Sequence, residues 1–272
     1  MQSKKPSMDD KTDRLDPTES SLFVGSLAKA FQVLEAFRDT HREMSIAEIA
    51  RAADLDRSAT QRIIYTLEHL NYIRRLPDSN LYALAPQVLS LAYNYLRTRR
   101  IIERATPYLV EMTHTLGETS NLQELDGHEI VFIARIPGRY LFSTDFTVGS
   151  RLPAVYSASG RAMLAKLSTA QRAQVIAATP NTKITPQTET DPEVLMRCIE
   201  QAETDGFAIV QNQTVTGDIS MGAPVTGHNG QPLGAVNISV PSTRWTTAKA
   251  EKMLLPHVLL AATSISNILD NF

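Results

Sequence analysis

The sequence of 272 residues is poor in cysteine, in long apolar runs and in net charge. Cys198 is its single cysteine, so no disulfide can form within the chain, and a cysteine-rich zinc site would need more thiols. No stretch approaches about 18 uninterrupted apolar residues, so we expect no transmembrane helix. Residues 1–21 lack the apolar core of a signal peptide and are strongly polar. We therefore expect a cytoplasmic protein without membrane contact, beginning with a disordered tail at residues 1–21.

Motifs of catalysis and of metal binding are also missing. The chain has no Gly-x-x-x-x-Gly-Lys phosphate loop and no paired-histidine metal motif. A serine-hydrolase elbow requires glycines two residues before and after its nucleophile, and Ser159 has Ser157 and Arg161 in those places. We predict no catalytic residue, no metal site and no cofactor, and a small-molecule hydrolase is the least favoured class of function.

The composition is otherwise that of a globular protein. With 43% hydrophobic and 21% charged residues the chain can bury a core, and its length predicts two domains. The net charge of −2 conceals a gradient, because residues 22–100 carry a net charge of +3 and residues 101–272 a net charge of −4. A basic segment followed by an acidic one is typical of a nucleic-acid-binding module joined to a domain of another kind.

Residues 22–85 have the pattern of three short helices and a β-hairpin. Ser26 is the expected N-cap of the first helix, whose apolar face is Leu27, Ala30, Phe31, Leu34 and Phe37. Ser45 and Glu48 have the spacing of a capping box and predict the start of a second helix. A third helix is expected over residues 57–70, followed by two short strands around a turn at residues 77–80. This order predicts a winged helix-turn-helix whose third helix enters the major groove of DNA.

The third helix divides into an apolar and a polar face. The inward residues are expected to be Ala59, Ile63, Leu67 and Leu70, with Ile64 at the edge. The candidate DNA-contacting residues can hydrogen-bond to bases or phosphates; they are Arg57, Ser58, Thr60, Gln61, Arg62 and Tyr65. A small helical domain that binds protein has the same pattern. A sensor or scaffold that does not bind DNA is therefore the alternative function.

Residues 101–272 alternate between helical and strand-like patterns. Strands are expected at residues 129–136, 140–146, 207–211 and 233–240, and helices at 105–116, 159–167, 169–178, 192–205 and 246–269. Mixed order with short loops is typical of an α+β domain on an antiparallel sheet. A helix at residues 86–100 would link the two domains. Three arginines lie at its end: Arg97, Arg99 and Arg100. They are expected either to be stabilised by the helix dipole or to contact phosphate.

The segments 26–35, 45–50, 55–67, 81–84, 217–225 and 234–241 resemble the IclR-type bacterial transcriptional regulators. The resemblance implies binding of double-stranded operator DNA, a linker helix that carries the signal, and a GAF-like effector-binding domain at residues 101–272. It also implies a homo-oligomer, a dimer or a tetramer, that acts as a repressor or an activator. The chain departs from the family at Asn71, where a glycine is usual, and at acidic Asp56, a candidate N-cap. Val210 and Gln213 stand where the family commonly has acids.

The effector site is expected where a Ser-Ala-Ser-Gly loop runs into a helix. The N–H groups of a helix N-terminus can hold a carboxylate, and the resemblance implies that this loop contacts the effector. The candidate ligand-binding residues are Tyr156, Ala158, Ser159, Gly160, Ser220, Asn237 and Ser239. Capping by Ser157 or Ser159, and bonds from the other polar groups to nearby backbone, are the structural alternatives. Loss of the acids at positions 210 and 213 favours a small organic acid with a hydrophobic portion, either aromatic or short-chain.

Overall fold

The computed structural model of the chain describes residues 17–37, 42–139 and 146–270. The chain divides into two compact units, residues 1–95 and residues 96–272. Of the predicted tail, residues 1–16 lie outside the described residues, and Pro17–Glu19 forms a short 3-10 helix, η1. The predicted strand at residues 140–146 also lies almost wholly outside the described residues.

The first unit is a three-helix domain with a small sheet. Its helices are α1 (Gly25–Glu35), α2 (Ile46–Ala52) and α3 (Arg57–His69), and its strands are β1 (Met44–Ser45), β2 (Ile73–Arg75) and β3 (Leu81–Leu84). The strands form an antiparallel sheet in the order β1-β3-β2. The core between helices and sheet consists of Val33, Met44, Ile49, Ala53, Ile64, Leu67, Ile73 and Tyr82. This is the predicted helix-turn-helix with a hairpin wing, and β1 is an addition that the sequence did not predict.

Local chemistry sets the boundaries of these helices. The capping box is confirmed, because the backbone N–H of Ser45 donates to the Glu48 carboxylate at 2.8 Å and the Glu48 N–H donates to the Ser45 hydroxyl at 3.4 Å. Asp56 caps α3 through a 2.8 Å bond from the Ala59 N–H, and this bond is the main reason that the pKa of Asp56 is lowered. Asn71 has a φ of 63°, so asparagine supplies the left-handed turn that follows the helix.

Three expectations for this unit are wrong. Helix α1 begins at Gly25 with Val24 at its N-cap position, so Ser26 lies inside the helix and does not cap it. The predicted apolar face of this helix is present but only partly buried, with Leu27 at 56% and Phe31 at 50% exposure. In α3, Ile64 is a core residue. Leu70 lies at the end of that helix and is exposed. The sequence indicated the apolar residues of α1 and α3 correctly, but some of these residues face the surface of the unit.

The stretch of chain that contains the boundary between the two units is helical, with a break. Helix α4 (Val88–Thr98) has no buried residue, and α5 (Arg100–Leu116) follows it after Arg99. The Arg99 guanidinium pairs with the buried carboxylate of Glu124, with its Nε at 2.8 Å from Oε1. The sequence suggested that Arg99 interacts with the helix dipole or contacts phosphate. The ion pair with Glu124 is a different role.

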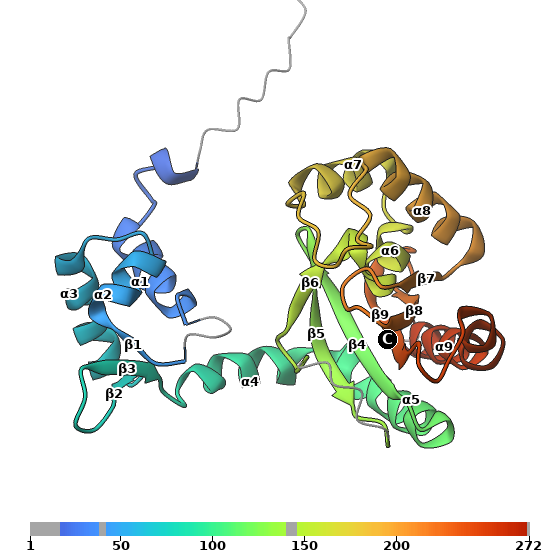
Figure 1. Ribbon diagram of the computed structural model, residues 1–272, viewed down its shortest axis with the longest axis horizontal. Helices are drawn as coiled ribbons and strands as arrows, with labels where there is room; N and C mark the ends of the chain where they lie inside the picture. The colour runs from blue at the N-terminus through green and yellow to red at the C-terminus, as the bar shows by residue number, and fades with distance from the viewer. Residues whose placement is uncertain (1–16, 38–41, 140–145, 271–272) are drawn as a thin grey trace, which may run out of the picture. The chain divides into compact units, whose positions relative to one another are not determined.

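The second unit is built on a curled antiparallel sheet with helices on both faces (Figure 1). Within the described residues the strand order is β6-β5-β4-β9-β8-β7. The strands are β4 (Thr119–Asp126), β5 (Glu129–Ile136), β6 (Arg151–Pro153), β7 (Ala208–Gln211), β8 (Asp218–Thr226) and β9 (Pro232–Pro241). The helices are α5, η2 (Ala154–Tyr156), α6 (Ala158–Leu164), α7 (Thr169–Ala178), α8 (Pro192–Asp205) and α9 (Thr247–Asp270). This is the α+β architecture expected from the sequence.

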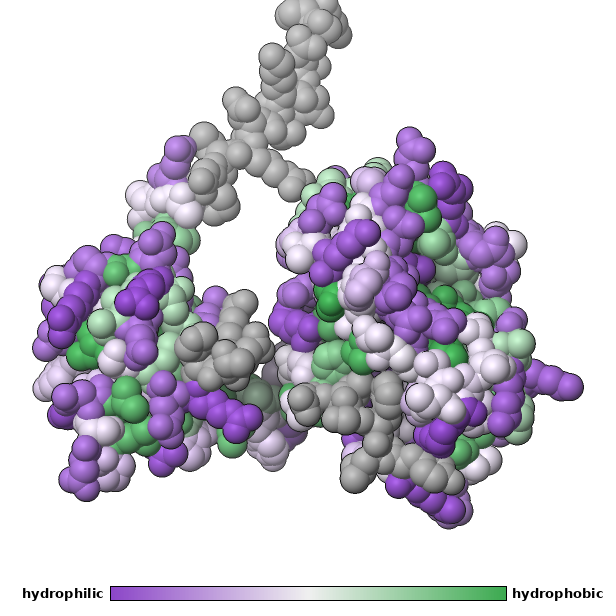
Figure 2. All heavy atoms as spheres, viewed as in Figure 1, coloured by the Kyte–Doolittle hydropathy of each residue, from purple (hydrophilic) through white to green (hydrophobic). Residues whose placement is uncertain are grey.

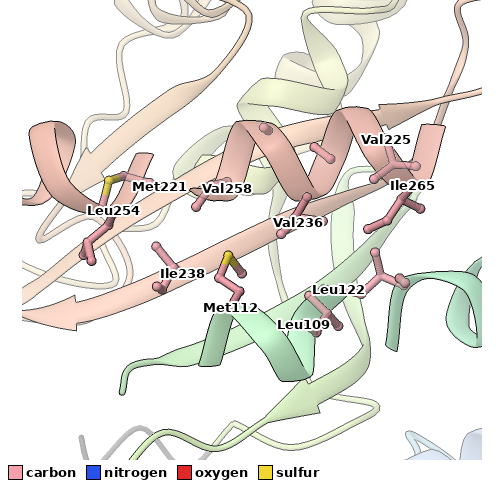
Figure 3. Close-up of a cluster of buried hydrophobic side chains, with 14 of the residues drawn as sticks. Leu109, Met112, Leu122, Met221, Val225, Val236, Ile238, Leu254, Val258 and Ile265 are labelled. Carbon is pink, nitrogen blue, oxygen red and sulfur yellow. The ribbon is translucent and has the colours of Figure 1, made fainter. Parts of the chain in front are cut away.

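The two faces of the sheet bury separate cores. Helices α5 and α9 cover one face, and Figure 3 shows their side chains interleaved with those of β4, β8 and β9, among them Met112, Leu122, Met221 and Ile238. Helices α6, α7 and α8 with η2 cover the other face. Among the described residues, α9 is long and apolar enough to span a bilayer by length and composition alone. Its inner residues, including Leu254 and Val258, are buried against the sheet, as in the core helix of a globular domain.

Candidate functional sites

The exposed face of α3 carries most of the predicted DNA-contacting residues. Arg57, Ser58, Gln61, Arg62 and Tyr65 are all exposed, and Tyr65 is 74% exposed. They rise from a helix whose opposite side is anchored in the core, so their direction is fixed by packing. The Ser58 hydroxyl donates to the Asp56 carboxylate at 2.8 Å, which ties it to the N-cap. The face presents hydrogen-bonding groups suited to the edges of a duplex groove.

Thr60 does not belong to this face. Its side chain is fully buried, and its hydroxyl donates to the backbone oxygen of Asp56 at 2.9 Å. The inclusion of Thr60 among DNA-contacting residues is therefore wrong, because a β-branched residue one turn into the helix satisfies its hydroxyl on the preceding turn.

The hairpin wing adds two arginines that the sequence analysis did not single out. Arg75 is used within the hairpin, where its Nε donates to the Ser79 oxygen at 3.0 Å and its Nη2 bonds the Asn80 side chain. Arg74 is exposed at the adjacent position of β2. Alternation along the strand places the two side chains on opposite faces, so they have different roles.

An apolar groove lies beside the recognition helix. It has a volume of about 980 Å³ and lies between α1, α3 and α4; its apolar lining is Val24, Leu27, Ala30, Phe31, Leu34, Ala59, Ile63, Leu67, Leu70, Tyr72 and Leu91. Arg62 and Lys29 stand among these residues. Figure 2 shows apolar residues at the surface of this unit among the polar ones. Exposed apolar groups gathered in a groove mark a surface that associates with another surface.

In the second unit a small cavity collects five of the seven predicted ligand-binding residues. Ala158, Ser159, Ser220, Asn237 and Ser239 line it. The remaining lining residues come from the sheet and its flanking loops: Asn121, Gln123, Ile130, Phe132, Arg135, Phe146, Leu152, Ser157, Val210, Thr214 and Asp218. The rings of Phe132 and Phe146 stack with centroids 5.3 Å apart. The cavity is about 20 Å³, which holds about one water molecule, so a larger ligand must displace lining side chains.

Tyr156 and Gly160 do not line this cavity. Tyr156 is 2% exposed and its hydroxyl donates to the Pro180 oxygen at 3.4 Å, and burial raises its pKa. A Cβ on Gly160 would stand 2.1 Å from the backbone oxygen of Ala154, so glycine lets α6 pack directly on η2. Both residues serve the packing of this corner of the second unit.

The start of α6 uses the capping interaction. The Ser157 hydroxyl accepts from the Gly160 N–H at 3.0 Å, so one N–H of the helix N-terminus is already bonded within the protein. The Ser159 hydroxyl points elsewhere and donates to the Gln123 side chain on β4. A Cβ on Gly222 would stand 2.7 Å from the Ser159 nitrogen, so α6 approaches β8 this closely because residue 222 has no side chain.

A chain of hydrogen bonds crosses the sheet at the cavity. Arg135 on β5 donates to the Asn121 oxygen at 2.9 Å, and Asn121 on β4 donates to the Asn237 oxygen at 2.8 Å. Asn237 on β9 donates in turn to the Ser220 hydroxyl on β8 at 2.6 Å. The strand register places Asn121 opposite both Arg135 and Asn237, so the network follows one row across the sheet. Burial lowers the pKa of Arg135.

The cavity also contains an acid that was not among the predicted site residues. Val210 is apolar and lines the cavity, as its sequence position suggested. Asp218, at the start of β8, lines the cavity too and is 5% exposed. Its Oδ1 accepts a bond from the Ser239 hydroxyl at 3.0 Å, and burial raises its pKa to about 7. The described lining therefore includes a carboxyl group, although Val210 and Gln213 stand where the family commonly has acids.

Gln213, the other departure, has a structural role. Its Nε2 donates to the Gln187 oxygen at 2.9 Å, while its Oε1 accepts from the Glu189 N–H at 2.9 Å. A glutamate could accept but could not donate, so the amide fits this position better than the acid. The substitution fastens the loop before α8 and has no contact with the cavity.

A helix-turn-helix unit followed by a unit with a polar internal cavity is the architecture of a transcriptional regulator with an effector-binding domain. Comparison with known proteins gives the same class of protein. The family model "IclR helix-turn-helix domain" matches residues 26–77, and "Bacterial transcriptional regulator IclR C-terminal" matches residues 93–267. The chain belongs to the IclR family of bacterial transcriptional regulators.

Individual relatives support this assignment. The chain is 34% identical to the Pca regulon regulatory protein of Pseudomonas putida over 242 residues, which cover 89% of this chain and 82% of the relative. A putative transcriptional regulator from Rhodococcus sp. RHA1 has a similar structure, with a TM-score of 0.78 and 32% identity over 91% of this chain and 98% of that one. An IclR homolog from Microbacterium hydrocarbonoxydans, solved with 4-hydroxybenzoate, shares the fold at a TM-score of 0.75 and 24% identity, covering 90% of this chain and 98% of that one.

Proposed function

We propose that the protein is a cytoplasmic regulator that binds operator DNA as a dimer, and that a small organic acid in the cavity of the second unit alters this binding. The observation that carries the proposal is the position of Arg135. Among the described residues that line the cavity it is the one cation, and Asn121 holds it in place at 2.9 Å. A guanidinium held by a hydrogen bond in a partly apolar cavity is suited to a carboxylate.

The carboxylate is assigned to Arg135 and not to the start of α6. The Ser157 cap already occupies the Gly160 N–H, whereas the arginine carries a full positive charge. The phenyl rings of Phe132 and Phe146, with Ile130 and Leu152, form the apolar part of the lining. This lining suits the hydrophobic portion of an aromatic or short-chain acid.

DNA is assigned to the exposed face of α3. Arg57, Ser58, Gln61, Arg62 and Tyr65 contact bases or phosphates in the major groove, and exposed Arg74 on the wing contacts the flanking backbone. In the dimer, two such helices face two half-sites of the operator.

A second copy of the chain is the proposed occupant of the apolar groove. Leu27, Phe31 and Leu91 are each about half-exposed there, and association of two copies would remove them from water. Helix α4, which has no buried residue, adds exposed Leu89 and Tyr93 to the surface available for the dimer. A symmetric dimer buries the same surface on both copies, so the apolar groove of each copy is covered by the other.

The signal is proposed to travel along β4. Gln123 lines the cavity, and Glu124, the next residue, points to the opposite face, where it holds Arg99 at the junction of α4 and α5. A ligand that displaces Gln123 would shift this strand and with it the anchor of α4. The ligand changes operator affinity only to the extent that it binds two arrangements of the dimer with different affinities.

The test begins with the full-length protein and a random pool of duplexes. Duplexes retained through repeated selection are labelled, and their affinity is measured by fluorescence anisotropy over a range of salt concentrations. DNA binding predicts an affinity that falls steeply with salt, because phosphate contacts release counterions. Arg57→Ala is compared with Arg51→Ala, a matched exposed arginine on α2. Loss of affinity in the first variant alone supports the assignment, whereas equal affinities, or selection of no duplex, favour a winged helix that binds protein.

A further inference from the structure

Asp218 is a buried carboxyl group that forms no ion pair with any residue that the structure describes. It is 5% exposed and lines the cavity, and its Oδ1 accepts one hydrogen bond, from the Ser239 hydroxyl at 3.0 Å. Within the described parts of the chain, no lysine, arginine or histidine forms an ion pair with it. The other buried carboxyls of this unit differ: Glu118 is paired with Arg244 at 2.9 Å, and Glu124 with Arg99.

A buried carboxyl without a cation is costly, because neither water nor a counter-charge stabilises the ionised form. Burial raises the pKa of Asp218 to about 7, so near neutral pH the group exists in both protonation states. The side chains of Pro241, its neighbour across the strand pair, and of Val210, which also lines the cavity, are apolar and offer the carboxyl group no hydrogen bond. Perturbed groups of this kind inside a cavity are candidates for ligand recognition.

The chemistry of the cavity restricts the ligand group that would meet Asp218. A second carboxylate would be repelled by the ionised acid, and an apolar group would leave the carboxyl unsatisfied. An ammonium group pairs only with the ionised state and would have to be desolvated beside Phe132 and Val210. A hydroxyl group can donate to the carboxylate and accept from the carboxylic acid, so it suits both protonation states.

We propose that Asp218 is a specificity-determining residue that binds a hydroxyl group of the effector, which is therefore a hydroxylated organic acid with its carboxylate at Arg135. The inference rests on the proposed function, because it requires an acid in this cavity. It adds a requirement that a simple carboxylic acid does not meet. The effector bridges two ionisable residues that the chain holds on different strands, Arg135 on β5 and Asp218 on β8. Such a site rejects an analogue without the hydroxyl, because the buried carboxyl is then left unpaired.

The test is calorimetric titration of the full-length protein with matched pairs of acids. The probes are benzoate with 4-hydroxybenzoate and 3-hydroxybenzoate, butyrate with 3-hydroxybutyrate, and 4-(aminomethyl)benzoate, whose alkylamine is protonated at neutral pH, as the ammonium comparison. The 4-hydroxy compound is included because a protein of the same fold was solved with it. We expect at least one hydroxylated acid to bind at least tenfold more tightly than its parent, as a hydrogen bond to a charged group implies.

The variant Asp218→Asn keeps the size of the side chain and an acceptor for Ser239, and we expect it to reduce this preference to threefold or less. Asp126→Asn is the control, because Asp126 is an exposed carboxylate at the far end of β4 and does not line the cavity. Fluorescence of Trp245 verifies that each variant is folded. A preference that Asp126→Asn keeps and Asp218→Asn loses establishes the role of Asp218.

The other outcomes separate this inference from the function on which it rests. Equal binding of hydroxylated and parent acids, or a preference that survives in Asp218→Asn, overturns the role of Asp218 and leaves acid sensing intact. Tightest binding of 4-(aminomethyl)benzoate overturns the choice of a hydroxyl group. If none of the acids binds, acid sensing itself is refuted for this panel, and the role of Asp218 falls with it.

Discussion

The buried carboxyl of Asp218 makes the stability of the second unit depend on pH. Its pKa is raised to about 7 in the folded protein, from an ordinary value of 3.8, so between these two pH values the folded state retains a proton that the unfolded state has lost. This contribution to stability is therefore fully present below about pH 4 and is lost as the pH rises through about 7. The difference of about 3 pH units corresponds to about 4 kcal/mol, of which about 3 kcal/mol falls between pH 5 and pH 8.

The substitution Asp218→Asn removes this dependence, because the amide has no proton to lose in this range. We expect the stability of the variant relative to wild type to rise by about 3 kcal/mol from pH 5 to pH 8. Trp245 is the single tryptophan of the chain and bonds Glu118 at 2.9 Å in the second unit, so its fluorescence reports the unfolding of that unit in urea. The control variant Asp126→Asn shows how much the pH dependence of stability changes when an exposed carboxylate is removed. A stability difference that stays constant within about 1 kcal/mol over this pH range would show that Asp218 is not held in a desolvated site.

Four further substitutions test the rest of the account. Phe31→Glu places a charge in the apolar groove, and we expect sedimentation to show monomers at concentrations where the wild type is dimeric. Arg62→Ala should weaken binding to a selected operator by about 1–3 kcal/mol if the residue reads a base, and unchanged affinity would remove it from the interface. Glu124→Gln should leave acid binding intact while reducing the effect of the acid on operator affinity, and full retention of that effect would exclude the β4 route. Gly222→Ala should destabilise the second unit by about 1–3 kcal/mol in urea unfolding, since its Cβ would stand 2.7 Å from the Ser159 nitrogen, and wild-type stability would show that α6 can move away.

Elements whose signals are local could be predicted from the sequence. The Ser45–Glu48 capping box, the Asp56 cap and the turn at Asn71 depend on side chains within three residues of the backbone that they fix. Helices α7 and α8 have the predicted bounds, since each begins at a cap residue and ends where the apolar pattern ends.

Elements that depend on distant contacts could not be predicted. Strand β4 was missed because Thr119, Ser120 and Asn121 look like a polar loop, and these residues are buried only because β5 and β9 lie on either side. The apolar face of α1 was recognised, but its exposure is a property of the folded unit that periodicity does not reveal.

The residues of the cavity could likewise be predicted only in part. Ser159, Ser220 and Asn237 were chosen on the family resemblance and on alternation along one strand, and the structure brings them together. Arg135 and Asp218 were overlooked, although a single arginine in the apolar run at residues 129–136 was a usable signal. Their proximity to the other residues follows from strand order and register, which join segments more than 80 residues apart.

The central claim is that an acid bound at Arg135 changes the affinity of the protein for its operator. The most direct measurement is the anisotropy of a labelled operator, selected from the random pool, titrated with full-length protein with and without a saturating acid that calorimetry has shown to bind. We predict a change in operator affinity of at least fivefold for the wild type, and none for Arg135→Met, which retains operator binding without the acid. An acid that binds to the wild type and leaves its operator affinity unchanged would contradict the account.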